Sequence, residues 1–174
     1  RKLLIVDDDT GIQRQLRWSF DDYDVSVAGS REEAVAQFRS EAPSVVTVDL
    51  GLPPDPDGAS EGFATVEEIL KLSPESKLIV VTGNEDHENA LKAVALGAYD
   101  FYRKPIDSDE LGHIIQRAYQ LYDLEQENRR LAERGSGAAL TGVICADPEM
   151  LKVCRLVEKV APTNVTAMLL GESG

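Results

Sequence analysis

Short apolar runs recur through the first part of the chain, and each ends at a polar side chain. Residues 3–6, 44–49 and 77–82 form three such runs, rich in Val, Ile and Leu. Runs without polar alternation are typical of strands buried on both faces, as in a parallel sheet. Residues 24–27 alternate in polarity, which favours an edge strand, and residues 101–102 are a plausible fifth strand.

Amphipathic segments separate these runs and predict helices. Ser30 and Glu33 form a capping-box pattern at the start of one helix, and Gly97 stands where another helix would end. Ser108 is a candidate cap for the last of them. The helices are expected over residues 12–20, 31–39, 63–72, 88–96 and from 108 onward. Strands alternating with helices predict an α/β fold, namely a doubly wound parallel sheet with helices on both faces.

The last predicted helix is unusually long and continues to about Arg134. Leu121, Leu124, Asn128 and Leu131 follow one another at spacings of 3, 4 and 3 residues. This is the seam of a coiled coil, in which a core asparagine can fix the register of a dimer. A surface helix with a narrow apolar stripe is the alternative interpretation.

The rest of the chain predicts a linker and a second structural unit. Residues 135–142 begin with a Gly- and Ser-rich stretch, which indicates a flexible linker. Asp147 and Pro148 suit the N-cap and first turn of a helix, and residues 165–170 suit a strand. We therefore divide the chain into four segments: 1–120, 108–134 as the extended helix, 135–142, and 143–174.

Composition and charge limit the possible functions. The 174 residues are 43% hydrophobic, enough for a buried core, and no apolar run is long enough to cross a membrane. The net charge is −13, and residues 1–110 carry 11 basic against 23 acidic side chains. Such a segment repels nucleic acid and instead suits a divalent cation or a basic partner. Cys145 and Cys154 are interpreted as unremarkable thiols in a reducing cytoplasm.

Functional side chains stand at the carboxyl ends of four predicted strands, and these ends meet at one edge of a parallel sheet. They are the acids at 7–9, Asp49, Thr82 and Lys104. Clustered carboxylates favour Mg²⁺, which prefers oxygen ligands. An ionised Asp49 could then attack phosphorus to form an acyl phosphate. Lys104 and Thr82 could neutralise and hydrogen-bond the transferred group.

Asp7-Asp8, Asp49, Thr82 and Lys104-Pro105, in this order, resemble the receiver domain of two-component response regulators over about residues 1–120. The resemblance implies a flavodoxin-like sheet of five strands in the order 2-1-3-4-5. It implies that a sensor histidine kinase phosphorylates Asp49. Asp8, Asp49 and the Gly51 carbonyl would bind Mg²⁺, with Asp7 acting through water.

The same resemblance assigns three further roles. Thr82 and Phe101 match the pair of residues that respond to phosphorylation, although Phe101 could simply be a core aromatic. Pro105 matches a cis-proline that follows the lysine. The conformational change that follows phosphorylation would reach the face formed by the fourth helix, fifth strand and fifth helix. Two copies would dimerise there, along the extended helix.

Two departures from the family pattern lie beside the acceptor. Residues 54–60 form an insertion in the loop after Asp49. Its acids suit either a solvated turn or a role in metal or partner binding. Gly51 and Asn84 are small or neutral groups two residues after Asp49 and Thr82, and they would leave the phosphoryl group open to water. We therefore predict a short-lived acyl phosphate.

The tail has a resemblance of its own. Residues 146–162 and 169–174 resemble the start of the AAA+ module of NtrC-like activators of sigma-54 RNA polymerase. Gly171 matches the first glycine of a P-loop, whose second glycine, lysine and hydroxyl residue are absent, so no nucleotide site is expected here. The expected parent protein is longer, with residues missing before Arg1 and with an ATPase ring and a DNA-binding domain after the tail.

We therefore expect a cytoplasmic, Mg²⁺-dependent signalling switch, not an enzyme in its own right. Contacts with sigma-54 polymerase and DNA would come through regions outside this chain, and no membrane contact is expected. A stand-alone adaptor and a nucleotide-binding domain are alternatives; the second is disfavoured because acids, not glycines, follow the first strand. An aspartyl-phosphate phosphatase would need an acid where Gly51 stands.

Overall fold

The computed structural model describes residues 1–83, 87–136, 147–160 and 168. It contains two compact units, Arg1–Leu124 and Glu125–Gly174, which are described separately. Several predicted features lie outside the described residues, wholly or for the most part. They are Asn84, residues 137–142 of the linker, Cys145, the strand at 165–170 and Gly171.

The first unit is built on five parallel strands in the order β2-β1-β3-β4-β5, which confirms the predicted topology. The strands are β1 Lys2–Val6, β2 Asp24–Ala28, β3 Val45–Asp49, β4 Lys77–Thr82 and β5 Asp100–Arg103. Every residue of β3 is buried, because helices cover both faces of the sheet. The edge strand β2 is mostly half-buried, as its alternating pattern predicted.

Six helices are described: α1 Thr10–Ser19, α2 Arg31–Glu41, α3 Ser60–Leu72, α4 His87–Ala95, α5 Ser108–Ser136 and α6 Pro148–Val160. Ser30 caps α2 as predicted, accepting a hydrogen bond from the Glu33 amide at 3.3 Å. The cap of α5 was predicted wrongly. Asp107, not Ser108, accepts the free amide hydrogens there, at 2.9 and 3.2 Å.

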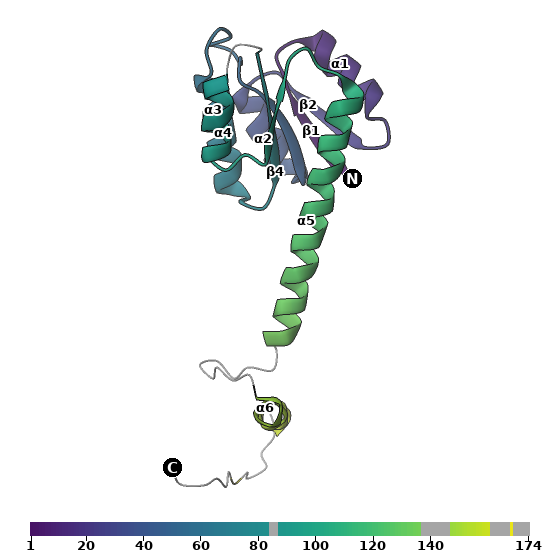
Figure 1. Ribbon diagram of the computed structural model, residues 1–174, viewed down its shortest axis with the longest axis vertical. Helices are drawn as coiled ribbons and strands as arrows, with labels where there is room; N and C mark the ends of the chain where they lie inside the picture. Colours follow the sequence, from purple (N-terminus) through teal and green to yellow (C-terminus); the bar gives the residue numbers. More distant parts are fainter. Residues whose placement is uncertain (84–86, 137–146, 161–167, 169–174) are drawn as a thin grey trace. The chain divides into compact units, whose positions relative to one another are not determined.

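Helices lie on both faces of the sheet (Figure 1). Each face carries its own hydrophobic layer. One layer packs α2, α3 and α4 on residues such as Val46 and Val80. The other packs α1 and α5 on residues such as Ile5 and Ile79. Successive strand residues point to opposite faces, so each apolar run supplies both layers and fixes the strands in register.

Close backbone approaches set the ends of two helices. Gly97 adopts φ +111° after α4, and the Ala98 amide donates to the Ala93 carbonyl at 3.0 Å. This bond closes the helix as predicted, at a position that favours glycine. At the start of α3, a Cβ on Gly62 would lie 2.4 Å from the Leu50 Cα. The absence of a side chain therefore lets α3 pack directly against the residue that follows Asp49.

The extended helix and the tail helix form where the sequence predicted them. Along α5, Leu124 is 59% exposed and Leu131 is 54% exposed, so the proposed seam is available for packing. Asp147 caps α6 by accepting the amides of Glu149 and Met150, at 2.9 and 3.0 Å. No helix in the described part of the chain is both long and apolar enough to span a membrane.

Candidate functional site

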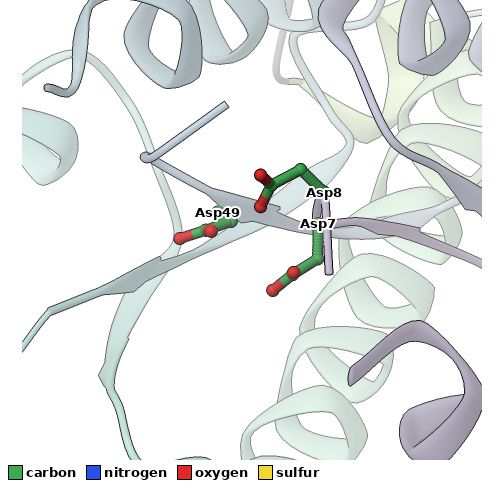
Figure 2. A group of neighbouring side chains, drawn as sticks. All are labelled: Asp7, Asp8 and Asp49. Atoms are coloured by element: carbon green, nitrogen blue, oxygen red, sulfur yellow. The ribbon is translucent and has the colours of Figure 1, made fainter. Parts of the chain in front are cut away.

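Three carboxylates meet where β1 and β3 end. Val6 lies opposite Val48 in the parallel register, so Asp7, just after β1, and Asp49, the last residue of β3, follow side by side. Asp8 follows in the same loop. One oxygen of each carboxylate lies within 4.8 Å of one from each of the others. Figure 2 shows the three side chains grouped at this edge, as the sequence predicted.

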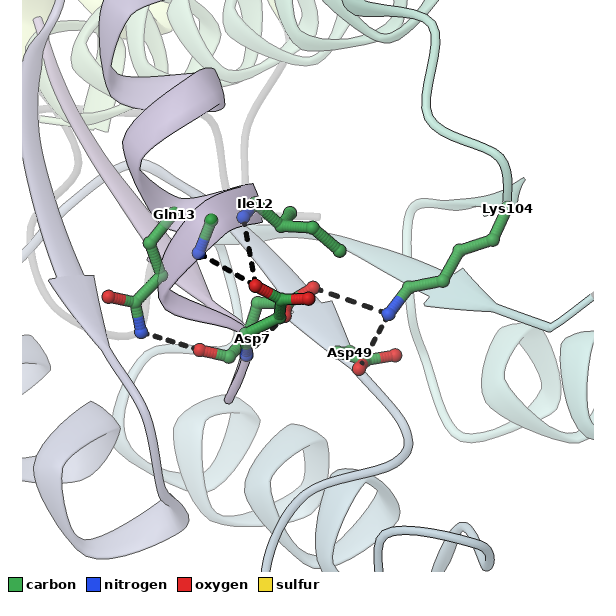
Figure 3. A network of polar contacts seen from close by, with 7 residues as sticks. Asp7, Ile12, Gln13, Asp49 and Lys104 are labelled. Atoms are coloured by element: carbon green, nitrogen blue, oxygen red, sulfur yellow. Dashed lines mark hydrogen bonds and ion pairs between the residues drawn. The ribbon is translucent and has the colours of Figure 1, made fainter.

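Burial distinguishes the three acids. Asp7 is 2% exposed and Asp49 is 6% exposed, whereas Asp8 faces solvent. The Asp7 side chain accepts the Asp9 amide at 2.9 Å, and the Gln13 side-chain amide donates to the Asp7 carbonyl at 2.6 Å. These bonds, drawn in Figure 3, fix Asp7 between β1 and α1. Asp7 is therefore a rigid member of the cluster.

Asp9, the third acid of the same run, has a different task. Its carboxylate accepts the amides of Gly11 and Ile12 at 2.7 and 3.3 Å and caps α1. A carboxylate at this end of a helix satisfies free amides and interacts favourably with the helix dipole. Asp9 is therefore committed to the fold and lies outside the carboxylate cluster.

Lys104 brings a positive charge to the buried carboxylates. Its backbone amide donates to the Thr82 carbonyl at 2.8 Å, which aligns the end of β5 with the end of β4. The Lys104 Nζ then lies 2.9 Å from Asp49 Oδ2 and 3.4 Å from Asp7 Oδ2 (Figure 3). The Lys104–Pro105 bond is cis, as the resemblance implied.

The ionisation of the cluster follows from this geometry. Burial raises the pKa of Asp7, an effect that the Asp9 amide and Lys104 partly offset and that Asp49 reinforces. Burial alone would lower the pKa of Lys104, but its contacts with Asp49 and Asp7 outweigh that effect and raise it. Lys104 therefore remains an ammonium ion, able to meet an anionic group.

Thr82 and Phe101 occupy the next two strands. Thr82 is 1% exposed, and its Oγ1 has no hydrogen-bond partner among the described residues. A buried hydroxyl without a partner is uncommon and suits a site that awaits a ligand or a rearrangement. Phe101 is half-buried against the layer of α2, α3 and α4, and the Arg103 guanidinium lies 6.0 Å from its ring centroid.

The loop after Asp49 approaches the site more closely than the sequence indicated. A Cβ placed on Gly51 would lie 2.6 Å from the Pro56 carbonyl oxygen and 3.9 Å from Asp49 Oδ2. The inserted segment therefore packs directly against Gly51. A backbone oxygen carries no sequence signal, so sequence reasoning could not have found this contact. The predicted openness of a phosphoryl group to water also involves Asn84, which lies outside the described residues, and it stays a prediction.

The donor set fits a hard divalent cation. Three carboxylates supply only oxygen, the ligand type that Mg²⁺ binds, and the exposed Asp8 leaves room for coordinated water. The buried Asp49 carboxylate, the Lys104 ammonium ion and the buried Thr82 hydroxyl lie at one edge of the sheet, a combination suited to accepting a phosphoryl group.

Comparison with curated proteins finds relatives along almost the whole chain. Regulatory protein AtoC of Escherichia coli K12 is 30% identical over 176 residues, covering 99% of this chain. The DNA-binding transcriptional regulator NtrC of Salmonella typhimurium LT2 is 27% identical over 98% of the chain. The chain spans just over a third of the length of these relatives, 37% and 35% respectively.

Solved structures give the same result. NtrX from Brucella abortus in complex with ADP has a TM-score of 0.71 at 28% identity, covering 94% of this chain and 36% of that one. A CheY-like receiver domain protein from Methanospirillum hungatei JF-1 has a TM-score of 0.65 at 30% identity, covering 72% and 98%. The profile of the response regulator receiver domain matches residues 3–116. The predicted resemblance is thereby confirmed: the chain belongs to the response regulator receiver domain family, and its relatives include regulators of the NtrC type.

Proposed function

We propose that the chain is a phospho-accepting switch in which a sensor histidine kinase phosphorylates Asp49. The arrangement of Asp49 supports the proposal most directly. Its nearly buried carboxylate lies beside two further carboxylates and 2.9 Å from the Lys104 amine. A structural carboxylate rarely needs such a costly cluster of like charge, whereas phosphoryl transfer uses a nucleophile, a cation site and a fixed positive charge.

Asp8, Asp49 and the Gly51 carbonyl would hold Mg²⁺, with Asp7 acting through a water molecule. The ion, when bound, would neutralise negative charge on the incoming phosphoryl group. Asp7 would in addition orient Lys104, which its Oδ2 meets at 3.4 Å. Lys104 therefore has a second carboxylate partner besides Asp49.

The transfer step follows from the positions of these groups. An Asp49 oxygen attacks phosphorus, the P–N bond of the kinase phosphohistidine breaks, and its electron pair returns to the imidazole. Lys104 meets the phosphoryl oxygens with its ammonium group, and the Thr82 hydroxyl donates a hydrogen bond to them. The product is an acyl phosphate on Asp49.

The signal would leave the site through Thr82 and Phe101. Thr82 Oγ1 lacks a partner among the described residues, and a phosphoryl oxygen would provide one. Movement of Thr82 toward the phosphoryl group would leave space into which the Phe101 ring turns. The phosphoryl group would shift the equilibrium between the resting and the rearranged conformation only if it interacts more favourably with the second.

The output would be control of an attached AAA+ activator that acts with sigma-54 RNA polymerase. The similarity to NtrC-type regulators over 98–99% of the chain supports this, because it extends past the receiver domain into the tail. The ATPase and DNA-binding functions would belong to regions outside this chain. A cytoplasmic location follows from the same proposal.

Labelling with a small phosphodonor tests the acceptor. The unmodified chain incubated with acetyl phosphate and Mg²⁺ should gain one phosphoryl group, seen by intact mass or retarded gel mobility. Asp49→Asn should abolish the gain, because an amide cannot form the acyl phosphate. Asp57→Asn, which changes an exposed acid of the nearby loop, is the matched control and should be labelled normally.

The labelling experiment has two outcomes that contradict the proposal. Undiminished labelling of Asp49→Asn would place the acceptor at another residue. If the wild-type chain is folded but is not labelled either, phosphorylation is not the function of this cluster.

A second test addresses the proposed dimer. Leu124 is more than half exposed on α5, at the centre of the apolar seam. Leu124→Glu should convert the dimer to a monomer in sedimentation experiments, because dimerisation would bury the new carboxylate in the apolar seam without a partner of opposite charge. Leu72→Glu, at an exposed leucine of α3, should leave the dimer intact. If the wild-type chain stays monomeric at high concentration, the proposal that two copies pair along this seam is wrong.

A further inference from the structure

Asp8 is the acid of the cluster that its own side-chain contacts hold least. The side chain faces solvent and makes no hydrogen bond or ion pair with the described residues. One of its oxygens nevertheless lies within 4.8 Å of an oxygen of Asp7 and of one of Asp49 (Figure 2). Like charges at this distance repel one another, which favours turning Asp8 outward. The direction of Asp8 therefore depends on its backbone.

Hydrogen bonds hold the peptide groups on both sides of Asp8. The Asp7 carbonyl belongs to the peptide group before Asp8, and it accepts the Gln13 side-chain amide at 2.6 Å (Figure 3). The Asp9 amide belongs to the peptide group after Asp8, and it donates to Asp7 Oδ1 at 2.9 Å. Each peptide group is planar and rigid, so fixing both groups fixes the two backbone torsions of Asp8. These torsions set the direction in which its carboxylate leaves the chain.

Gln13 is suited to this task because it stands near the start of α1. Its backbone amide donates to the carbonyl of Asp9, the N-cap residue of that helix, at 3.0 Å. Its side chain is half-buried, so water competes less for the Asp7 carbonyl than it would at an exposed position. The glutamine amide donates without carrying a charge, so it adds nothing that would repel a cation.

We propose that Gln13 is a positioning residue for the cation site. It fixes the peptide group before Asp8, so that the Asp8 carboxylate is held ready for a divalent ion. This inference rests on the proposed function, in which Asp8 binds Mg²⁺. Because Mg²⁺ requires nearly ideal octahedral geometry, a carboxylate that is already in place lowers the ordering cost of binding. Gln13 touches no ion itself and acts through Asp8.

Gln13→Met tests this role, because methionine is about as long as glutamine and cannot donate a hydrogen bond. The thermal midpoint is measured against MgCl₂ concentration at constant ionic strength and without a phosphodonor, which gives the dissociation constant of Mg²⁺. That constant should rise about tenfold, the lower end of the effect of removing a partner of a metal ligand. Gln15→Met, at an exposed glutamine of the same helix, is the matched control and should bind Mg²⁺ like the wild type.

Ca²⁺ separates positioning from a general loss of stability. It accepts irregular coordination, so Gln13→Met should weaken Ca²⁺ binding less than Mg²⁺ binding. A variant that is merely less stable would have a lower midpoint without any ion and unchanged dissociation constants. Gln13→Leu also lacks the donor and replaces Gln13→Met in every measurement if the methionine variant does not melt cooperatively.

A double variant tests the route through Asp8. Asp8→Asn removes the carboxylate that Gln13 is proposed to position. Adding Gln13→Met to Asp8→Asn should therefore weaken the remaining Mg²⁺ binding no further. If Gln13→Met costs the same factor in affinity with and without the Asp8 carboxylate, Gln13 does not act through Asp8.

The outcomes distinguish this inference from the proposed function. If Gln13→Met binds Mg²⁺ as tightly as the wild type, or loses affinity for Mg²⁺ and Ca²⁺ equally, the positioning role is wrong and the cation site survives. If MgCl₂ does not stabilise the wild type beyond matched NaCl, the cation site of the proposed function fails first, and the role of Gln13 fails with it.

Discussion

Lys104 is the residue on which the electrostatics of the site depend most. Its amine is the charge that lies between two nearly buried carboxylates, 2.9 Å from Asp49 and 3.4 Å from Asp7. Each carboxylate would repel an incoming phosphoryl dianion if that amine were absent. Under the proposed function the ammonium group would have two tasks, since it stabilises the resting cluster and would meet the negative charge of the incoming phosphoryl group.

Lys104→Met should therefore slow labelling by phosphoramidate about 100-fold, the typical loss when one fixed charge or donor is removed from a reacting group. The measurement is the initial rate of phosphoprotein formation at saturating Mg²⁺. Lys71→Met removes a lysine that is 76% exposed on α3 and should label at the wild-type rate. Equal rates for Lys104→Met and the wild type would exclude Lys104 from the reaction.

Residue identities could be predicted from the sequence where a side chain supplies the chemistry. Asp7, Asp8, Asp49 and Lys104 were predicted to converge because each follows a strand, and they do. Prediction failed where backbone geometry decides. No residue pattern indicates that the Pro56 carbonyl packs against Gly51, since that contact depends on the fold of the inserted loop.

Among the elements, α5 shows how one helix is fastened to the sheet. The Tyr119 hydroxyl donates to the Lys2 carbonyl at 2.6 Å, and its ring stacks on Tyr23 at 5.3 Å between centroids. Tyr119 is 2% exposed, and this burial raises its pKa well above the ordinary value. The neutral phenol is therefore part of the folded state.

The free energy of unfolding should fall at alkaline pH for this reason. Above the ordinary tyrosine pKa of 10.0, the unfolded chain loses the Tyr119 proton while the folded chain keeps it, so stability falls by about 1.4 kcal/mol per pH unit. Tyr119→Phe should cost about 1 kcal/mol at pH 8 through the lost hydrogen bond. The difference in free energy of unfolding between Tyr119→Phe and the wild type should then shrink or reverse by about pH 11, because phenylalanine does not titrate.

Urea unfolding at several pH values measures these differences. Leu111→Ala, a core variant in the same helix, keeps the phenol and should show a constant deficit across the pH range. A Tyr119→Phe deficit that also stays constant would mean that the hydroxyl does not titrate as its burial requires.

Element boundaries were predictable only where side chains mark them. The strand runs and the end of α4 just before Gly97 were predicted because apolar continuity and a glycine stop are strong signals. The start of α3 was placed at residue 63, whereas the helix begins at Ser60. The residue at the N-cap position is Ala59, whose side chain cannot accept a hydrogen bond, so no capping residue indicates the start of the helix.

At the scale of the whole molecule, charge is the dominant feature. The chain carries a net charge of −13, and its functional site gathers three carboxylates around one ammonium group, that of Lys104. Self-repulsion of this kind opposes the compact state. A cation bound only by the folded protein would relieve it, which links the proposed function to stability.

We expect about 10 mM MgCl₂ to raise the thermal midpoint more than NaCl at equal ionic strength, because a ligand that binds only the folded state stabilises it while salt merely screens charge. Asp8→Asn should remove most of this excess, since it deletes a carboxylate of the site without disturbing a buried one. Asp57→Asn removes the same single negative charge, yet should retain the extra stabilisation by MgCl₂. If MgCl₂ and matched NaCl stabilise the wild type equally, the three carboxylates serve some purpose other than binding a divalent cation, and phosphorylation of Asp49 should then proceed without Mg²⁺.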